Sequence, residues 1–442
     1  MTNIESNKRK VLLVSFQFPP QASMAAIRLG KFAKYLPQFG WEPIILTRNK
    51  TEDSPSISPL EIDDSSIIRT PYSFLYHNIY QRAVAGKPDH QKATVQRIAG
   101  KGVSSIARLL SFISRQPSVR LLIPDVTGWY PHAIRSGHEL LKREDVEIVF
   151  SSSPPFVSHL VASHLHRRTN IPWIAEFRDL WAQNPYIPKL QPFQSLEEHL
   201  EKSTMRGSNL LITVSTPLAK ELEQLHNKET VIITNGFDEE DYTEIIPLTS
   251  KFTITYTGSI YHGRQEVSSL LEAVKLLQAE GRVYPENFEL RFFGNNVIAE
   301  VAPMVKKYNL HELVKTYGLV PFTESIERQR ESAALLLLGW NDPREKGIYT
   351  GKLFEYLGAK RPILAIGLKG DVVDELLNMS GTGTMLTEVE EVKAVLDHWL
   401  DEFETCGEIN SYYNPNESVI AEFSRKKQAQ KLARLFDETC HK

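Results

Sequence analysis

Short apolar runs alternate with amphipathic stretches along the first part of the chain. Residues 11–16 (VLLVSF) are almost continuously apolar, the pattern of a strand buried on both faces of a parallel sheet. After a Pro-Pro turn, apolar residues recur at helical spacing from Leu29 to Leu36, and residues 43–47 (PIILT) indicate the next strand. This is a βαβ unit, whose crossover is expected to be right-handed.

The same alternation continues in two series. Further strands of the first series are predicted at 147–150, 173–177, 210–214 and 231–234. Strands of the second series are predicted at 252–256, 289–293, 334–338, 362–366 and 384–386. Between them, residues 238–250 are acidic and polar, as expected of a linker. The pattern predicts an α/β protein with two Rossmann-like, doubly wound domains, whose ligands bind at the carboxyl ends of the strands in a shared cleft.

Composition narrows the class of protein. The chain has 442 residues, 41% hydrophobic and 24% charged, and no apolar run approaches the length of a membrane span. The first ten residues lack the apolar core of a signal peptide, and two cysteines, Cys406 and Cys440, fit a reducing compartment. A net charge of -3 argues against general nucleic-acid binding. We therefore expect a soluble, cytoplasmic protein.

A basic insertion at about 71–120 interrupts the first series. Its positive residues are Arg82, Lys87, Lys92, Arg97, Lys101, Arg108, Arg115 and Arg120. Apolar residues between Val103 and Ile113 form a helical stripe, which has two interpretations. A basic amphipathic helix can lie on an anionic membrane surface, whereas a capping helix would pack its stripe on its own domain.

Residues 350–362 (TGKLFEYLGAKRP) combine a turn at Gly351 with the start of a helix. Unpaired N–H groups at a helix N-terminus suit a diphosphate, and Lys352 adds positive charge. Glu355, one turn further, is placed to accept hydrogen bonds from ribose hydroxyls. A P-loop is excluded, because the GxxxxGK[ST] pattern is absent and Leu353 follows the lysine. Taken alone, the segment also fits an ordinary amphipathic helix.

Six segments in order resemble glycosyltransferase family 4, the retaining enzymes of GT-B fold. They are FPP at 18–20, EFRDLW at 176–181, TVSTPLAKEL at 213–222, TNGFD at 234–238, YTGSIYHGR at 256–264 and KLFEYLGAKRPILAIG at 352–367. The resemblance implies an acceptor domain at 1–245, a nucleotide-sugar donor domain at 250–417, and a terminal helix at 418–442 that crosses back to the first domain. It also implies a UDP-, GDP- or dTDP-sugar donor.

The resemblance assigns donor-site roles. Glu355 matches the second glutamate of the family's E-x7-E pattern, which engages the ribose. Gly347 stands where the first glutamate is expected, and Glu345 is a substitute only if the loop shifts. Arg264, on the loop that begins at Gly258, is the preferred phosphate ligand; its alternative is a solvated loop arginine. Gly351 and Leu353 complete the candidate set.

Candidates for the acceptor side lie in the first domain. Arg178 and Asp179 follow a predicted strand at its carboxyl end, and Asp179 is a candidate to orient an acceptor hydroxyl or take its proton. An internal Arg-Asp pair is the alternative. Arg28 is a candidate phosphate or acceptor contact, or else a charge on a helix surface. Asp125 and Trp129 are cleft candidates, with core packing the alternative for Trp129.

Metal binding is not indicated, because the histidines His159, His164 and His262 show no ligand spacing. The predicted function is a retaining transfer of a sugar to a cell-surface glycan or its lipid-linked precursor, with possible peripheral contact to an anionic membrane. Two alternatives stay open. A nucleotide-sugar 2-epimerase shares the fold but releases a free sugar isomer, and a degenerate protein would bind the donor without turning it over.

Overall fold

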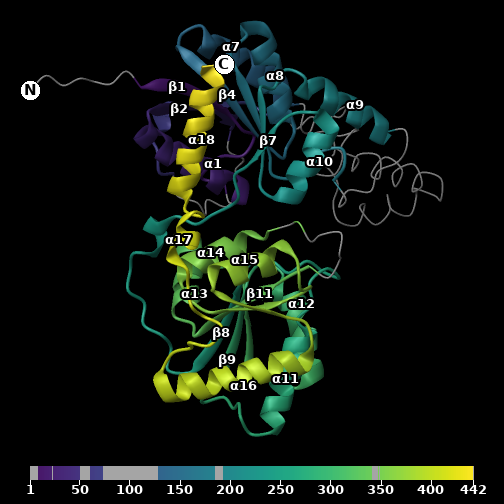
Figure 1. The fold of residues 1–442 in the computed structure, drawn as a ribbon, viewed down its shortest axis with the longest axis vertical. Helices are drawn as coiled ribbons and strands as arrows, with labels where there is room; N and C mark the ends of the chain where they lie inside the picture. Colours follow the sequence, from purple (N-terminus) through teal and green to yellow (C-terminus); the bar gives the residue numbers. More distant parts are fainter. Residues whose placement is uncertain are drawn as a thin grey trace, which may run out of the picture. The chain divides into compact units, whose positions relative to one another are not determined.

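The computed structural model describes residues 8–21, 23–49, 60–72, 128–184, 193–340, 347 and 349–441. Its contacts divide the chain into two compact units (Figure 1). Unit 1 comprises Met1–Ile233 and Ala429–Lys442, and unit 2 comprises Thr234–Gln428. The unit boundary therefore precedes the predicted linker at 238–250. Residues 73–120 of the predicted basic insertion lie outside the described residues, so its two interpretations remain predictions.

Unit 1 contains a parallel sheet in the order β3-β2-β1-β4-β5-β6-β7. The strands are β1 (Arg9–Val14), β2 (Trp41–Arg48), β3 (Ile67–Thr70), β4 (Val146–Ser153), β5 (Trp173–Phe177), β6 (Leu210–Thr213) and β7 (Thr230–Ile232). The order reverses between β1 and β4, the switch point at which such sheets open toward ligands.

Helices cover both faces of this sheet (Figure 1). They are α1 (Met24–Tyr35), α7 (Tyr130–Leu141), α8 (Val157–Thr169), α9 (Phe193–Met205), α10 (Thr216–His226) and the part of α18 (Arg425–Cys440) from Ala429 onward, with short 3-10 turns η1 (Leu36–Phe39) and η2 (Asp64–Ser66). Val11 and Leu13 pack on the side of α1 and α18, whereas Leu12 and Val14 pack on the side of α7 and α8. Burial on both faces explains why β1 is apolar throughout.

Unit 2 contains a second parallel sheet, in the order β10-β9-β8-β11-β12-β13. The strands are β8 (Phe252–Thr257), β9 (Phe288–Phe293), β10 (Val314–Tyr317), β11 (Ala334–Leu338), β12 (Ile363–Ile366) and β13 (Gly383–Leu386). The helical elements are η3 (Glu239–Tyr242), α11 (Ser268–Ala279), α12 (Val297–Tyr308), α13 (Phe322–Arg330), α14 (Gly351–Ala359), α15 (Val372–Ser380), α16 (Val389–Cys406) and α17 (Glu417–Ala421).

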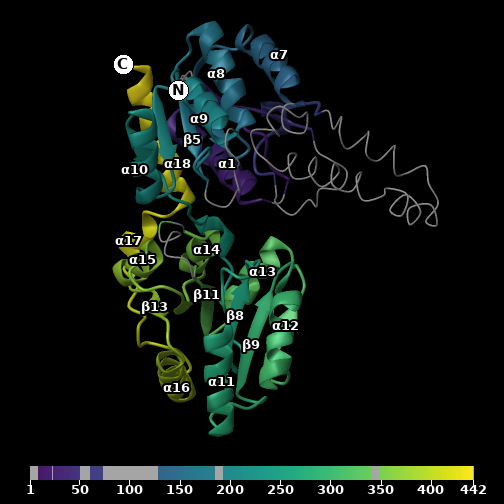
Figure 2. The ribbon, with the colours of Figure 1, turned by 90° about the vertical axis from the view of Figure 1, so that its right-hand side faces the viewer.

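The core of unit 2 also has two layers. Leu336 and Leu338 pack with α11, α12 and α16, whereas Leu335 and Leu337 pack with α14 and α15 on the other face. Figure 2 shows α11 and α16 side by side. No helix among the described residues is long and apolar enough to span a membrane. In open parallel sheets such as these two, functional groups lie in the loops that follow the carboxyl ends of the strands.

Candidate functional site

The N-terminus of α14 lacks a side-chain cap. Thr350 is the N-cap residue in an extended conformation, and its hydroxyl makes no capping bond. The Thr350 Oγ1 atom is buried and has no hydrogen-bond partner in the described structure. A helix normally satisfies its first N–H groups with such a cap, and uncapped N–H groups form an anion site when a ligand supplies the acceptor.

Lys352 and Gly258, both predicted at the donor site, lie in direct contact. The Lys352 ammonium lies 5.3 Å from the centroid of the Tyr256 ring, over its face. A Cβ atom on Gly258 would lie 2.4 Å from Lys352 Cε, and the Gly258 φ of +116° also favours glycine. Gly258 is thus the position that lets the Lys352 side chain cross the end of β8.

Burial lowers the pKa of Lys352 to about 8, and the charge of Glu355 opposes this shift. Burial likewise raises the pKa of Glu355, with Lys352 the main opposing charge. The two residues are three apart on α14 and so share one helix face. An ammonium and a carboxylate one turn apart at an uncapped helix N-terminus match the charge pattern of a nucleoside diphosphate and its ribose.

Gln329, which sequence reasoning missed, holds the carboxylate of Glu355. From α13, its Nε2 atom donates to Thr257 Oγ1 at 3.0 Å and to Glu355 Oε2 at 3.4 Å. Its own Oε1 atom is buried and has no partner among the described residues. Nothing in the local pattern of α13 marks this glutamine, because Thr257 and Glu355, the two partners that place it at the site, lie on other elements.

Two tyrosines fix α14 against its neighbours. The Tyr242 hydroxyl donates to the Glu355 carbonyl at 3.0 Å, and the Tyr356 hydroxyl accepts from the Thr257 N–H at 3.0 Å. Burial raises the pKa of both phenols, so both stay protonated at neutral pH. The end of β8 and the start of α14 are therefore held together before any ligand binds.

Arg264 lies half-buried on the loop after β8. Its N–H donates to the Tyr261 carbonyl at 3.0 Å, closing a turn. The loop is anchored upstream by Asn296, whose side chain accepts from the Ile260 N–H at 3.0 Å and donates to the Ile260 carbonyl at 2.5 Å. These bonds fix the backbone of the loop, so Arg264 starts from the same edge of the sheet as Gly258.

The remaining donor candidates differ in what they expose. Leu353 is fully buried in the core, so only its backbone N–H, which bonds Thr350 O at 3.3 Å, faces the helix start. Gly351 is the first residue of α14. Gly347 is buried in a turn, and Glu345 lies outside the described residues.

Arg28 is fully buried, so the alternative that it is a charge on a helix surface is wrong. Its guanidinium donates through Nε and Nη2 to Glu176 Oε1, at 3.0 and 2.7 Å, and through Nη2 to the Ile233 carbonyl at 2.8 Å. Both side chains of the ion pair are fully buried. An unpaired charge in the core would be costly, and Glu176, 148 residues away on β5, supplies the counter-charge that lets Arg28 be buried there.

Arg178 and Asp179 follow β5, as predicted. Arg178 donates from Nε to the Ser153 carbonyl at 3.0 Å and from Nη2 to the Pro154 carbonyl. Burial lowers the pKa of Arg178 to about 10. Within the described part of the chain no ion pair joins Arg178 to Asp179, so the bracing pair is not formed. The Asp179 side chain is exposed, but nearby protein atoms partly desolvate its carboxyl group. This desolvation raises the pKa of Asp179, and the charge of Arg178 opposes the shift.

Trp129 packs in the core of unit 1. It is fully buried, lies edge-to-face on Phe16 at 5.6 Å, and donates from Nε1 to Thr70 Oγ1 at 2.7 Å. This is the core-packing alternative rather than an exposed cleft residue. Asp125 lies outside the described residues.

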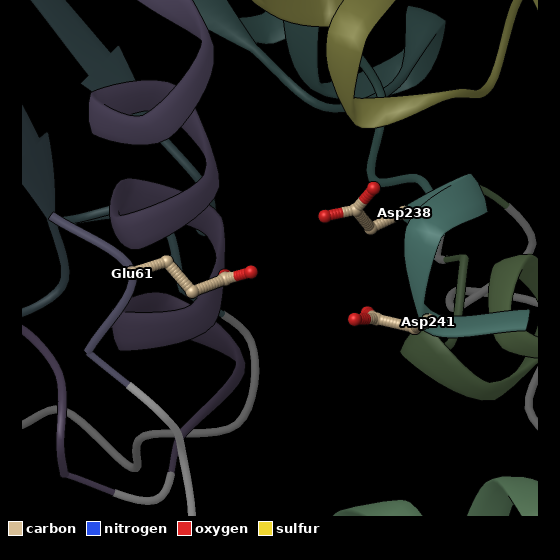
Figure 3. Close-up of side chains that lie close together, drawn as sticks. All are labelled: Glu61, Asp238 and Asp241. Atoms are coloured by element: carbon tan, nitrogen blue, oxygen red, sulfur yellow. The ribbon is translucent and has the colours of Figure 1, made fainter.

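Figure 3 shows three carboxylates, of which Glu61 and Asp238 have structural roles within their own units. Glu61 of unit 1 pairs with Lys31 at 2.8 Å and Lys34 at 2.7 Å. Asp238 of unit 2 caps η3 by accepting from the Glu240 N–H at 3.2 Å, and Asp241 lies on the same turn. Because Glu61 and Asp238 have these partners, we assign no metal site to the three carboxylates.

Comparison with known proteins agrees with the fold. Residues 83–241 match the model of Glycosyltransferase Family 4. Sucrose-phosphate synthase from Thermosynechococcus elongatus superimposes with a TM-score of 0.62 at 13% identity, covering 97% of this chain and 98% of that one. A glycosyltransferase from Rickettsia africae gives 0.61 at 15% identity, covering 98% and 99%. HepE from Anabaena, solved in complex with UDP, gives 0.60 at 12% identity, covering 97% and 100%. No curated protein matches by sequence.

The described residues form two parallel sheets, of seven and six strands, and the chain superimposes on the structures named above over nearly their whole length. This architecture is the GT-B fold. The family match at residues 83–241 lies mostly in unit 1, and this part of the chain is similar to Glycosyltransferase Family 4.

Proposed function

We propose that this protein is a retaining glycosyltransferase that takes a sugar from a nucleoside-diphosphate donor bound in unit 2. The observation that carries the proposal is that Lys352 and Glu355 lie one turn apart at the uncapped start of α14. Gln329 holds the Glu355 carboxylate and also bonds Thr257 at the end of β8. HepE, which shares the fold, has been solved with UDP and with UDP-glucose. These two structures support a nucleotide-sugar donor, and UDP-, GDP- and dTDP-sugars are the candidates.

In this proposal the residues of unit 2 stabilise the leaving group. Departure of the nucleoside diphosphate develops negative charge, which Lys352, Arg264 and the N–H groups of α14 neutralise. Glu355 accepts hydrogen bonds from the ribose. These cations take the place of a metal ion at the diphosphate, so the reaction requires no metal. The transition state is oxocarbenium-like, with the leaving diphosphate close to the incoming hydroxyl.

The acceptor is assigned to unit 1, where Asp179 is the exposed carboxylate that follows β5. A raised pKa makes it a better proton acceptor than an ordinary aspartate, because a base is most effective when its pKa approaches the working pH. We propose a growing cell-surface glycan or its lipid-linked precursor as the acceptor. The basic residues at 71–120 support a site of action at the cytoplasmic face of an anionic membrane.

The proposal is tested by calorimetry of the purified protein with UDP-, GDP- and dTDP-sugars, followed by mass spectrometry of the products. Glu355→Ala should lose about 1.5 to 3 kcal/mol of binding energy, the worth of a hydrogen bond to a charged group. Glu327→Ala, an exposed glutamate on α13, is the matched control and should bind as the wild type. Absence of binding to all three nucleotide classes would refute the proposal. An epimerised free sugar formed without acceptor would instead identify an epimerase.

A further inference from the structure

Arg48 is the last residue of β2, at the carboxyl edge of the sheet of unit 1. It is partly buried, and its Nε atom is covered by protein and has no hydrogen-bond partner in the described structure. Other arginines of this sheet are paired: Arg9 contacts Glu147 at 2.7 Å, and Arg69 donates to the Pro19 carbonyl at 3.1 Å. No hydrogen bond or ion pair of Arg48 occurs among the residues that the structure describes.

Aromatic rings hold the Arg48 guanidinium in place. Its central carbon lies 4.8 Å from the ring centroid of Phe16 and 5.9 Å from that of Tyr72. These two rings meet edge-to-face at 5.2 Å, and Phe16 packs in the same way on Trp129 at 5.6 Å. Phe16 and Tyr72 come just after β1 and β3, so three neighbouring strands supply the cradle at the edge where open α/β sheets bind ligands.

The two rings orient the Arg48 guanidinium but accept no hydrogen bond from its N–H groups as an oxygen atom would. A guanidinium has five N–H donors, and ring faces attract the cation without accepting these bonds as oxygen atoms do. Burial lowers the pKa of Arg48, with only the Tyr72 hydroxyl opposing the shift. Arg48 is a partly buried cation with no counter-charge among the described residues, and an incoming anion would reduce the cost of its desolvation.

We propose that Arg48 binds an oxyanion group of the acceptor, a phosphate or a carboxylate, within the aromatic cradle formed by Phe16 and Tyr72. The guanidinium fork matches both anions with two parallel hydrogen bonds. The proposal rests on the proposed function, which assigns the acceptor to unit 1. It deepens that function, because it requires the acceptor to carry a negative charge beside the sugar that receives the transfer.

Calorimetry with soluble probes tests the proposal. Geranyl diphosphate represents a lipid diphosphate and glucuronic acid an acidic sugar, with geraniol and glucose as their neutral counterparts. All titrations use the full chain carrying Lys352→Met, which weakens diphosphate binding in unit 2. We expect at least one anionic probe to bind, and Arg48→Met to weaken it by about tenfold or more, the worth of a charged hydrogen bond.

Two further variants keep the test specific. Arg48→Lys retains a cation in the cradle and should recover part of the affinity, whereas Arg135→Met removes an exposed charge of unit 1 and should change nothing. Binding of neither anionic probe, or equal binding by Arg48→Met and its parent, would overturn the proposal. Which anionic probe responds identifies phosphate or carboxylate as the group. Nucleotide affinity, measured separately in otherwise unmodified protein with and without Arg48→Met, tests the proposed function and should not respond to Arg48.

Discussion

Replacing Gly258 by alanine should weaken donor binding by displacing Lys352. Gly258 has a φ of +116°, and an added Cβ would lie 2.4 Å from Lys352 Cε and 3.2 Å from Lys352 Nζ. Real Cβ atoms do not approach other atoms this closely, so the lysine side chain must move off the end of β8. The displaced ammonium can then no longer meet the diphosphate from its position over the Tyr256 ring.

The magnitude separates into a backbone part and a contact part. Holding alanine in a left-handed conformation costs about 1 to 3 kcal/mol of folding stability. Loss of the charged contact to the diphosphate costs a further 1.5 to 3 kcal/mol, which is roughly a 10- to 150-fold loss of nucleotide affinity. The first part appears in the free energy of unfolding and the second in the dissociation constant, so the two are measured independently.

Gly281→Ala is the matched control. Gly281 follows α11 with a φ of +74°, and a Cβ there would meet nothing within 4 Å. Both variants should therefore unfold at lower urea concentration than the wild type, but only Gly258→Ala should lose nucleotide affinity. In a Lys352→Met background, Gly258→Ala should have no further effect on affinity. Equal nucleotide affinities of the two glycine variants would refute the inference that the missing side chain of Gly258 makes room for Lys352.

Two further predictions concern the same site. Because the pKa of Lys352 is lowered to about 8, its charge is present below that pH and is lost above it. Nucleotide affinity should therefore fall as pH rises through about 8, and Lys352→Arg should flatten this dependence between about pH 7 and 9.5, since arginine stays charged; a pH-independent affinity of the wild type would contradict the role of Lys352. Gln329→Ala removes the donor that holds the Glu355 carboxylate and should cost about 1 to 2 kcal/mol in urea unfolding together with several-fold weaker nucleotide binding. Lower stability without any change of affinity would limit Gln329 to a structural role.

The strands that sequence patterns predict best are those buried on both faces. The runs at 173–177 and 334–338 coincide with β5 and β11, because each residue of these strands is buried and all but Glu176 are apolar. The pattern missed β3 (IIRT) and β10 (VKTY). These four-residue strands at the sheet edges keep partly exposed side chains, so neither a continuous apolar run nor a clear alternation marks them.

The candidate site divides in the same way, by the distance over which its contacts act. Lys352 and Glu355 could be predicted because they lie one turn apart on a single helix, where spacing alone places them on one face. Gln329 and Arg28 depend on partners from other elements, and no local pattern shows that Glu176 or Thr257 lies beside them. Arg48 was missed for a related reason: what distinguishes it is the absence of a partner among its described neighbours, which only the folded chain reveals.

A crystal structure with the nucleoside diphosphate of the best-binding donor tests the central claim most directly. The account predicts a diphosphate oxygen within hydrogen-bond distance of Lys352 Nζ and of the first N–H groups of α14, with the ribose hydroxyls on the Glu355 carboxylate. A nucleotide bound elsewhere, with Glu355 facing only Gln329 and Lys352 unengaged, would contradict it.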